Sequence, residues 1–165
     1  MRVSVSATLK EHFWYSIEML GEAISKCPFH VWERTKDGHP YWQIVLHILT
    51  GLHYWTRDAD ASFDFPFSNR HVYPELDALP ADIVTPDEMQ SYFQTVKAQV
   101  ENFLATLSDE HLIDISDLNS EYTYLDLLLC QLRHIQHHLG ACNTILKENG
   151  APAIGWKDKY LREAG

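Results

Sequence analysis

The chain has 165 residues, and its formal net charge of −10 at pH 7 arises from 23 acidic side chains against 13 lysines and arginines. This length predicts one domain, residues 1–165, with enough residues to bury a sizeable core. The acidic balance argues against DNA or RNA as a partner, because binding a polyanion needs a basic surface. No run approaches the roughly 18 consecutive apolar residues of a membrane span, so we expect no membrane association and a cytoplasmic protein.

The three cysteines, Cys27, Cys130 and Cys142, form no Cys-x-x-Cys pair. An odd number of scattered thiols argues against a disulfide framework and fits a reducing cytoplasm. Cys130 falls on the leucine side of its helical segment, with Cys142 near it. We therefore expect both to be small core residues and poor metal ligands.

Two helical segments are predicted in the first third of the chain. Residues 6–26 carry an apolar stripe at helical spacing, formed by Leu9, Phe13, Ile17, Leu20 and Ile24. Cys27-Pro28 ends that helix, since proline disfavours helical geometry at the residue before it. A second helix is expected to start around Pro40 and to continue through Trp55 towards Asp60.

The third predicted helix has a clear start at Thr85, followed by Pro86 and Glu88. Thr85 can cap the helix, Pro86 suits its first turn, and Glu88 can complete a capping box. One apolar face then comprises Met89, Tyr92, Phe93, Val96, Val100, Phe103, Leu104 and Leu107. The proline-containing segment 61–85 before this helix is expected to be a long loop, and residues 108–120 a polar turn.

A fourth helix is predicted over residues 124–147, ending where Gly150 and Pro152 block its continuation. The aromatic side chains of Trp156 and Tyr160 suggest an ordered tail after it. Strand signals are few. The sequence therefore predicts an all-α protein, a four-helix bundle.

His134 and His138 are the first candidates for a functional site. Their spacing of four places both imidazoles on one face of the fourth helix, and that face points towards the core. His47 lies in the almost entirely apolar second helix, where a buried imidazole needs a partner, and Gly51 one turn later leaves space beside it. We interpret His47, His134 and His138 as ligands of one divalent metal ion, with His53 a weaker candidate; simple hydrogen-bonded core histidines are the alternative.

Three neutral imidazoles leave coordination positions open and keep a bound ion strongly Lewis acidic. Zn²⁺ is the first choice, and Ni²⁺, Mn²⁺ and Fe²⁺ also suit imidazole ligands. No catalytic or cofactor-binding residue can be assigned from the sequence. Tyr54 and Asp58 are the nearest candidates for a general base, and Gln131 lies one turn before His134, but each of the three fits a supporting or packing role better.

These residues resemble the DinB-like superfamily over essentially the whole chain. Residues 134–140 are similar to the His-x-x-His-His-Arg-Gly-Gln signature of that family, with Leu139 in place of Arg and Ala141 in place of Gln. Leu46-His47 matches the apolar approach to the first ligand of the family. Gly150-Ala151-Pro152 fits the Gly-x-Pro that follows the last helix.

The resemblance implies a four-helix bundle with a divalent metal on His47, His134 and His138, and with positions left for water or substrate. It also implies a homodimer. The family includes transferases and isomerases that use low-molecular-weight thiols such as bacillithiol or mycothiol, whose thiol pKa the metal is thought to lower.

The leading functional hypothesis is a metal-dependent enzyme, a thiol S-transferase or a hydrolase, acting on a small molecule. The alternative is a non-catalytic, stress-related binding protein of the same fold, whose metal is structural or vestigial. A third interpretation is a helical scaffold without metal. An exchangeable coordination position that faces a cavity would distinguish the first from the other two.

Overall fold

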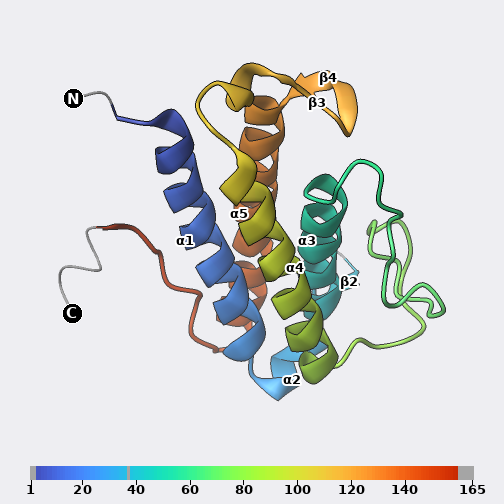
Figure 1. Ribbon diagram of the computed structural model, residues 1–165. Coiled ribbons are helices and arrows are strands. Elements are labelled where there is room, and N and C mark those ends of the chain that lie inside the picture. Colours follow the sequence, from blue (N-terminus) through green and yellow to red (C-terminus); the bar gives the residue numbers. More distant parts are fainter. Residues whose placement is uncertain (1–2, 37, 160–165) are drawn as a thin grey trace.

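The computed structural model describes residues 3–36 and 38–159, and four long helices dominate it (Figure 1). They are α1 (Val5–Ser25), α3 (Tyr41–Trp55), α4 (Pro86–Thr106) and α5 (Tyr124–Glu148). Each packs against two neighbours, in the order α1, α4, α3, α5 and back to α1. The predicted all-α four-helix bundle is confirmed.

Side chains cap the starts of three of these helices. Ser4 accepts a hydrogen bond from the Ala7 amide at the start of α1. The predicted capping box of α4 is present, with the Glu88 amide donating to Thr85 Oγ1 and the Thr85 amide donating to the Glu88 carboxylate. A second capping box, Thr123 with Asp126, starts α5. Each cap satisfies backbone amides that have no partner inside the helix.

Short elements that the sequence did not predict join the helices. They are α2 (Phe29–Trp32), the hairpin of β1 (Thr35–Lys36) with β2 (His39–Pro40), the 3₁₀ helix η1 (His111–Ile113), and the hairpin of β3 (Ile115–Ser116) with β4 (Asn119–Thr123). Both hairpins are antiparallel. Three of the strands have only two residues, and β4, with five, shows no alternation of buried and exposed residues, so sequence periodicity cannot reveal them.

Helix α3 ends at Trp55, short of the predicted extension towards Asp60. A side chain of the neighbouring helix α4 binds the last turn of α3. Gln99 Nε2 donates to the His53 carbonyl at 2.8 Å and to Thr56 Oγ1 at 3.0 Å. The Arg57 guanidinium donates to the Tyr54 carbonyl. The Gln99 contacts come from a distant part of the sequence, so a local pattern cannot predict that the helix ends here.

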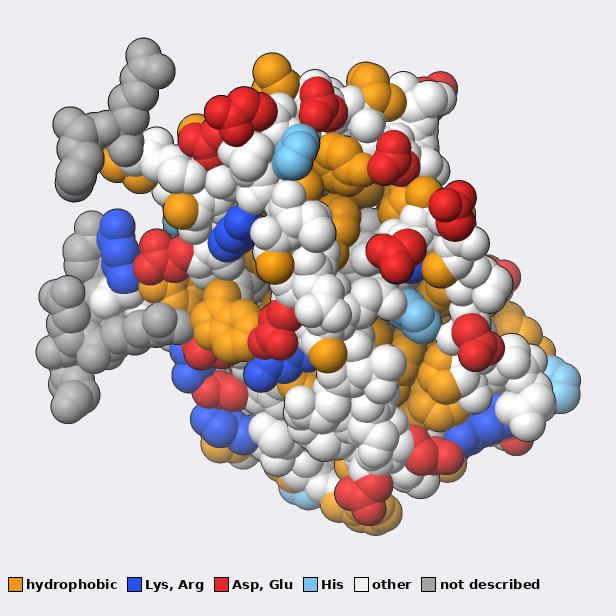
Figure 2. Space-filling model, in the orientation of Figure 1, with side chains coloured by type: hydrophobic (Ala, Val, Ile, Leu, Met, Phe, Trp, Pro, Cys, Tyr) orange, Lys and Arg blue, Asp and Glu red, His pale blue; other side chains and the backbone are white. Residues whose placement is uncertain are grey.

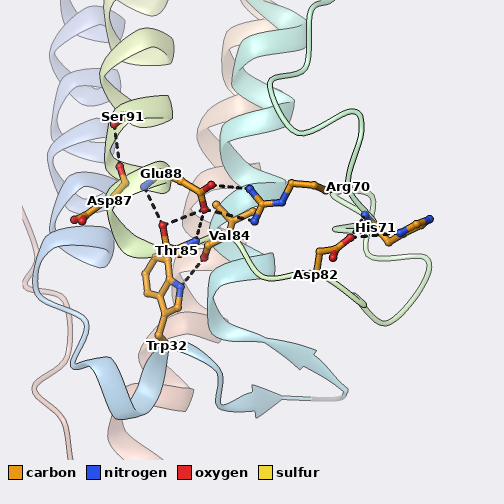
Figure 3. Close-up of polar contacts among 9 residues, drawn as sticks. All are labelled: Trp32, Arg70, His71, Asp82, Val84, Thr85, Asp87, Glu88 and Ser91. Atoms are coloured by element: carbon orange, nitrogen blue, oxygen red, sulfur yellow. Dashed lines mark hydrogen bonds and ion pairs between the residues drawn. The ribbon is translucent and has the colours of Figure 1, made fainter.

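The long loop between α3 and α4 lies beside α3 and returns to the bundle at the start of α4 (Figures 1 and 3). There Arg70 pairs with Glu88 at 2.7 Å. The Trp32 indole of α2 donates to the Val84 carbonyl at 2.8 Å in a buried position. The end of the loop is thus fixed to the bundle, although the loop has almost no regular structure.

The segment after α5 begins with Gly150, whose φ of +70° ends the helix as predicted. Ala151 and Ile154 are buried, but Trp156 is 65% exposed, so the expected tail is only partly packed. The other aromatic residue of the predicted tail, Tyr160, lies outside the described residues.

Acidic side chains are spread over the face of the molecule that Figure 2 shows, as the net charge of −10 leads one to expect. No helix in residues 3–36 or 38–159 combines the length and hydropathy that a membrane crossing requires.

Candidate metal centre

The three predicted histidines meet where α3 packs against α5. His134 Nε2 lies 2.9 Å from His47 Nε2. The ring centroid of His138 is 4.5 Å from that of His47 and 4.9 Å from that of His134. One ring nitrogen from each residue lies within 4.8 Å of the other two. Two nitrogens on one tetrahedral Zn²⁺ would be roughly 3.3 Å apart, so small ring movements would bring all three onto a single ion.

The orientation of His47 is set by the loop that follows α3. Its Nδ1 lies 2.7 Å from the carbonyl oxygen of Pro74, which can only accept a hydrogen bond. The Nδ1 atom therefore carries the proton, and the Nε2 lone pair of the neutral ring faces the other two histidines. Metal-binding histidines commonly have this arrangement, with one nitrogen on a carbonyl and the other on the ion.

The Pro74 carbonyl is itself held by an unusual stretch of loop. Tyr73 and Leu76 have φ angles of 44° and 59°, in the left-handed region that side chains other than glycine seldom adopt. The fully buried Gln43 fixes this stretch, because its Nε2 lies within hydrogen-bond distance of the Tyr73 carbonyl at 2.8 Å and the Ala78 carbonyl at 3.0 Å. Strained backbone that is held in this way is frequent at functional sites.

The environment keeps His134 and His138 neutral at pH 7. Burial, together with the neighbouring His47 and His137, lowers the pKa of each side chain to about 4. A neutral imidazole has the lone pair that a metal ion needs. The donor set therefore fits a divalent cation.

Gly51 lies directly against the His134 ring. A Cβ atom at this position would be 3.2 Å from His134 Nδ1 and only 2.8 Å from Cε1, and the shorter distance is closer than Cβ atoms approach other atoms. His134 thus occupies the space that was predicted beside His47. Gly51 lets α3 and α5 come close enough for the two rings to meet.

A cavity of about 540 Å³ adjoins this cluster, within the size range of small-molecule sites. Its lining is His47, Thr50, Gly51, Tyr54, Trp55, Phe63, Glu75, Cys130, Gln131 and His134. Lysine and arginine are missing from this set of described residues, and most of the accessible wall is apolar. The cluster therefore faces a space that a small, largely apolar molecule can enter.

The residues that line the cavity include two of the other candidates from the sequence. Tyr54 and Gln131 line the cavity, whereas Asp58 is exposed and not part of it. His53 lies apart from the cluster and contacts the Tyr92 hydroxyl at 2.9 Å. Glu75 was missed, because only the folded loop carries it to the cavity.

The prediction that Cys130 is a core residue is wrong. It is partly exposed and lines the cavity, one turn before His134 on α5. The helical projection grouped it with the leucines, but the stripe of His134 and His138 continues back to it. Cys142 is fully buried, as predicted.

The fold and the cluster thus define a helical bundle with a three-histidine centre. The model of the DinB superfamily matches residues 17–142, and the chain belongs to this superfamily. No curated protein and no solved structure matches the chain.

Proposed function

We propose that the protein is a metal-dependent enzyme in which His47, His134 and His138 hold one divalent ion beside the cavity. The observation that carries this proposal is the convergence of three imidazole nitrogens within 4.8 Å of one another, where two of the three residues, His47 and His134, line a cavity of about 540 Å³. A divalent ion held there supplies Lewis acidity, which lowers the pKa of bound water or of a bound thiol. Both the hydrolase and the thiol-transferase hypotheses use this chemistry.

The cavity wall determines which molecules can enter. Tyr54 and Phe63 pack edge to face with ring centroids 5.4 Å apart, and Tyr54 and Trp55 do so at 5.1 Å. These aromatic rings favour an apolar or aromatic substrate. Without a cationic side chain in the described lining, a strongly anionic thiol gains no ion pair from the wall. We therefore favour a neutral, small electrophile as the substrate.

Glu75 is the residue best suited to accept a proton. It carries the single carboxylate among the described residues that line the cavity, and it directly follows Pro74, whose carbonyl orients His47. A positioned carboxylate typically contributes about 10²–10⁴-fold to a proton-transfer step. Glu75→Gln should therefore lower kcat while leaving the affinity for the metal unchanged.

Cobalt substitution tests whether the centre has an exchangeable position. The Co²⁺-loaded protein is titrated with 2-mercaptoethanol, and the visible spectrum is recorded. A new sulfur-to-cobalt charge-transfer band would support an open site that binds thiols. A spectrum unaffected by thiol, azide or a change in pH would show a closed site and favour the non-catalytic binding protein instead.

The same Co²⁺-loaded and Zn²⁺-loaded protein is then screened with neutral aromatic esters and with aromatic alkyl halides plus thiol. Turnover of esters without thiol identifies a hydrolase, and thiol-dependent turnover identifies a transferase. Activity that is equal in wild type and in the His138→Ala variant would refute a role for this centre.

A further inference from the structure

Two buried polar atoms beside the histidine cluster have no hydrogen-bond partner in the described part of the chain. They are Nδ1 of His134 and Oε1 of Gln131. Gln131 is only 4% exposed, and it lies one turn before His134 on α5. A buried polar atom without a partner destabilises the fold by about 1–3 kcal/mol, so two such atoms at one site need an explanation.

The two atoms face the same small space. A Cβ atom on Gly51 would lie 3.2 Å from His134 Nδ1 and 3.7 Å from Gln131 Oε1. The absence of a side chain at Gly51 leaves room for these two groups to approach each other.

Nδ1 of His134 and Oε1 of Gln131 do not form a hydrogen bond with each other in the structure, and the protonation pattern of the metal-free cluster gives them no reason to approach. His47 Nδ1 carries a proton because it faces the Pro74 carbonyl, so Nε2 of the neutral His47 ring is an acceptor. At 2.9 Å from that acceptor, Nε2 of a neutral His134 must be the donor. The Nδ1 atom of His134 then has only a lone pair, and a lone pair cannot bond to the carbonyl oxygen of Gln131.

We propose that Gln131 is the positioning residue for His134: its Oε1 accepts a hydrogen bond from Nδ1–H once the Nε2 lone pair of His134 is used as a metal ligand. This assignment rests on the metal site proposed above. Using Nε2 as a ligand requires the other tautomer, which places a proton on Nδ1 beside the unpaired Oε1. The change of tautomer, together with the small ring movement that places His134 on the ion, would give both buried atoms a partner and couple metal binding to Gln131.

Titration of Zn²⁺ into the metal-free protein, followed by calorimetry and by NMR of ¹⁵N-labelled histidine, tests this assignment. For wild type, Zn²⁺ should shift the proton of His134 from Nε2 to Nδ1 and protect it from exchange. Gln131→Leu should weaken Zn²⁺ binding by about 10–100-fold and expose that proton to exchange. Gln131→Glu, which keeps an acceptor, should bind Zn²⁺ at least as tightly as wild type.

Gln136→Leu is the matched control, because Gln136 lies on the same helix and donates to Ser16 Oγ at 3.0 Å, on α1. Its Zn²⁺ affinity should equal that of wild type. Equal affinity and an equally protected Nδ1 proton in Gln131→Leu would overturn the role of Gln131 while leaving the metal site intact. Failure of the wild-type protein to bind Zn²⁺ would overturn the metal site and the Gln131 assignment together.

Discussion

Gly51→Ala should disrupt the histidine centre, although alanine normally favours a helix. Alanine in place of glycine stabilises a helix interior by about 1 kcal/mol where space is free. At Gly51 the new Cβ would lie 2.8 Å from His134 Cε1, and an ordinary contact of 3.4 Å requires the ring to retreat by about 0.6 Å. Overpacking of this kind destabilises by about 1–3 kcal/mol, so the net loss in the free energy of unfolding lies between roughly zero and 2 kcal/mol.

The larger effect should be on metal binding. A ring movement of about 0.6 Å exceeds the tolerance of about 0.2 Å for metal–ligand distances, so His134 would be lost or strained as a ligand. We expect Zn²⁺ affinity, measured by competition with a chromogenic chelator, to fall by at least about 10–100-fold.

Gly140→Ala provides the matched control. Gly140 lies on α5, and a Cβ atom there would meet no described atom within 4 Å. This variant should be slightly more stable than wild type and should bind Zn²⁺ unchanged. A Gly51→Ala protein with wild-type Zn²⁺ affinity would refute the proposed geometry.

Three further predictions concern pH, thiol reactivity and the loop. The folded pKa of about 4 for His134 and His138 lies below the unfolded value of about 6.5, so the unfolded chain binds more protons between these values. The free energy of unfolding of the metal-free protein should therefore fall as pH drops from about 6.5 to about 4. Urea titrations should show a weaker pH dependence of this free energy in His134→Gln than in wild type. The same pH dependence in both proteins would contradict the prediction. Cys130 should be the first thiol of the native protein to react with a chromogenic disulfide, and Cys130→Ser should abolish this fast phase of the reaction. A fast phase that persists in Cys130→Ser would contradict the position of Cys130 at the cavity wall. Trp32→Phe leaves the buried Val84 carbonyl without its donor and should lower the free energy of unfolding by about 1–3 kcal/mol. A loss smaller than about 0.5 kcal/mol would show that this hydrogen bond contributes little to stability.

The parts of the structure that local sequence patterns control were predictable. The capping box at Thr85 and Glu88, the stop at Gly150 and the four apolar stripes gave the helices and the bundle. The spacing of His134 and His138 is likewise a local property of one helix.

The parts that depend on contacts between distant segments were not predictable. The Pro74 carbonyl reaches His47 because Gln43 holds a loop whose conformation has no local signature. The same loop brings Glu75 to the cavity. Cys130 was misplaced because a helical projection shows which residues share a face, but not where the neighbouring helix leaves that face open.

The most direct test of the account is the metal content of protein prepared without a histidine tag, for wild type and for the His47→Ala and His138→Ala variants. Elemental analysis after incubation with Zn²⁺, Ni²⁺ or Mn²⁺ and removal of free ions should give close to one ion per wild-type chain. Both variants should fold and contain almost none, because each lacks one of the three nitrogens that converge in the structure. A wild-type protein that retains no metal, or variants that retain as much as wild type, would contradict the three-histidine centre.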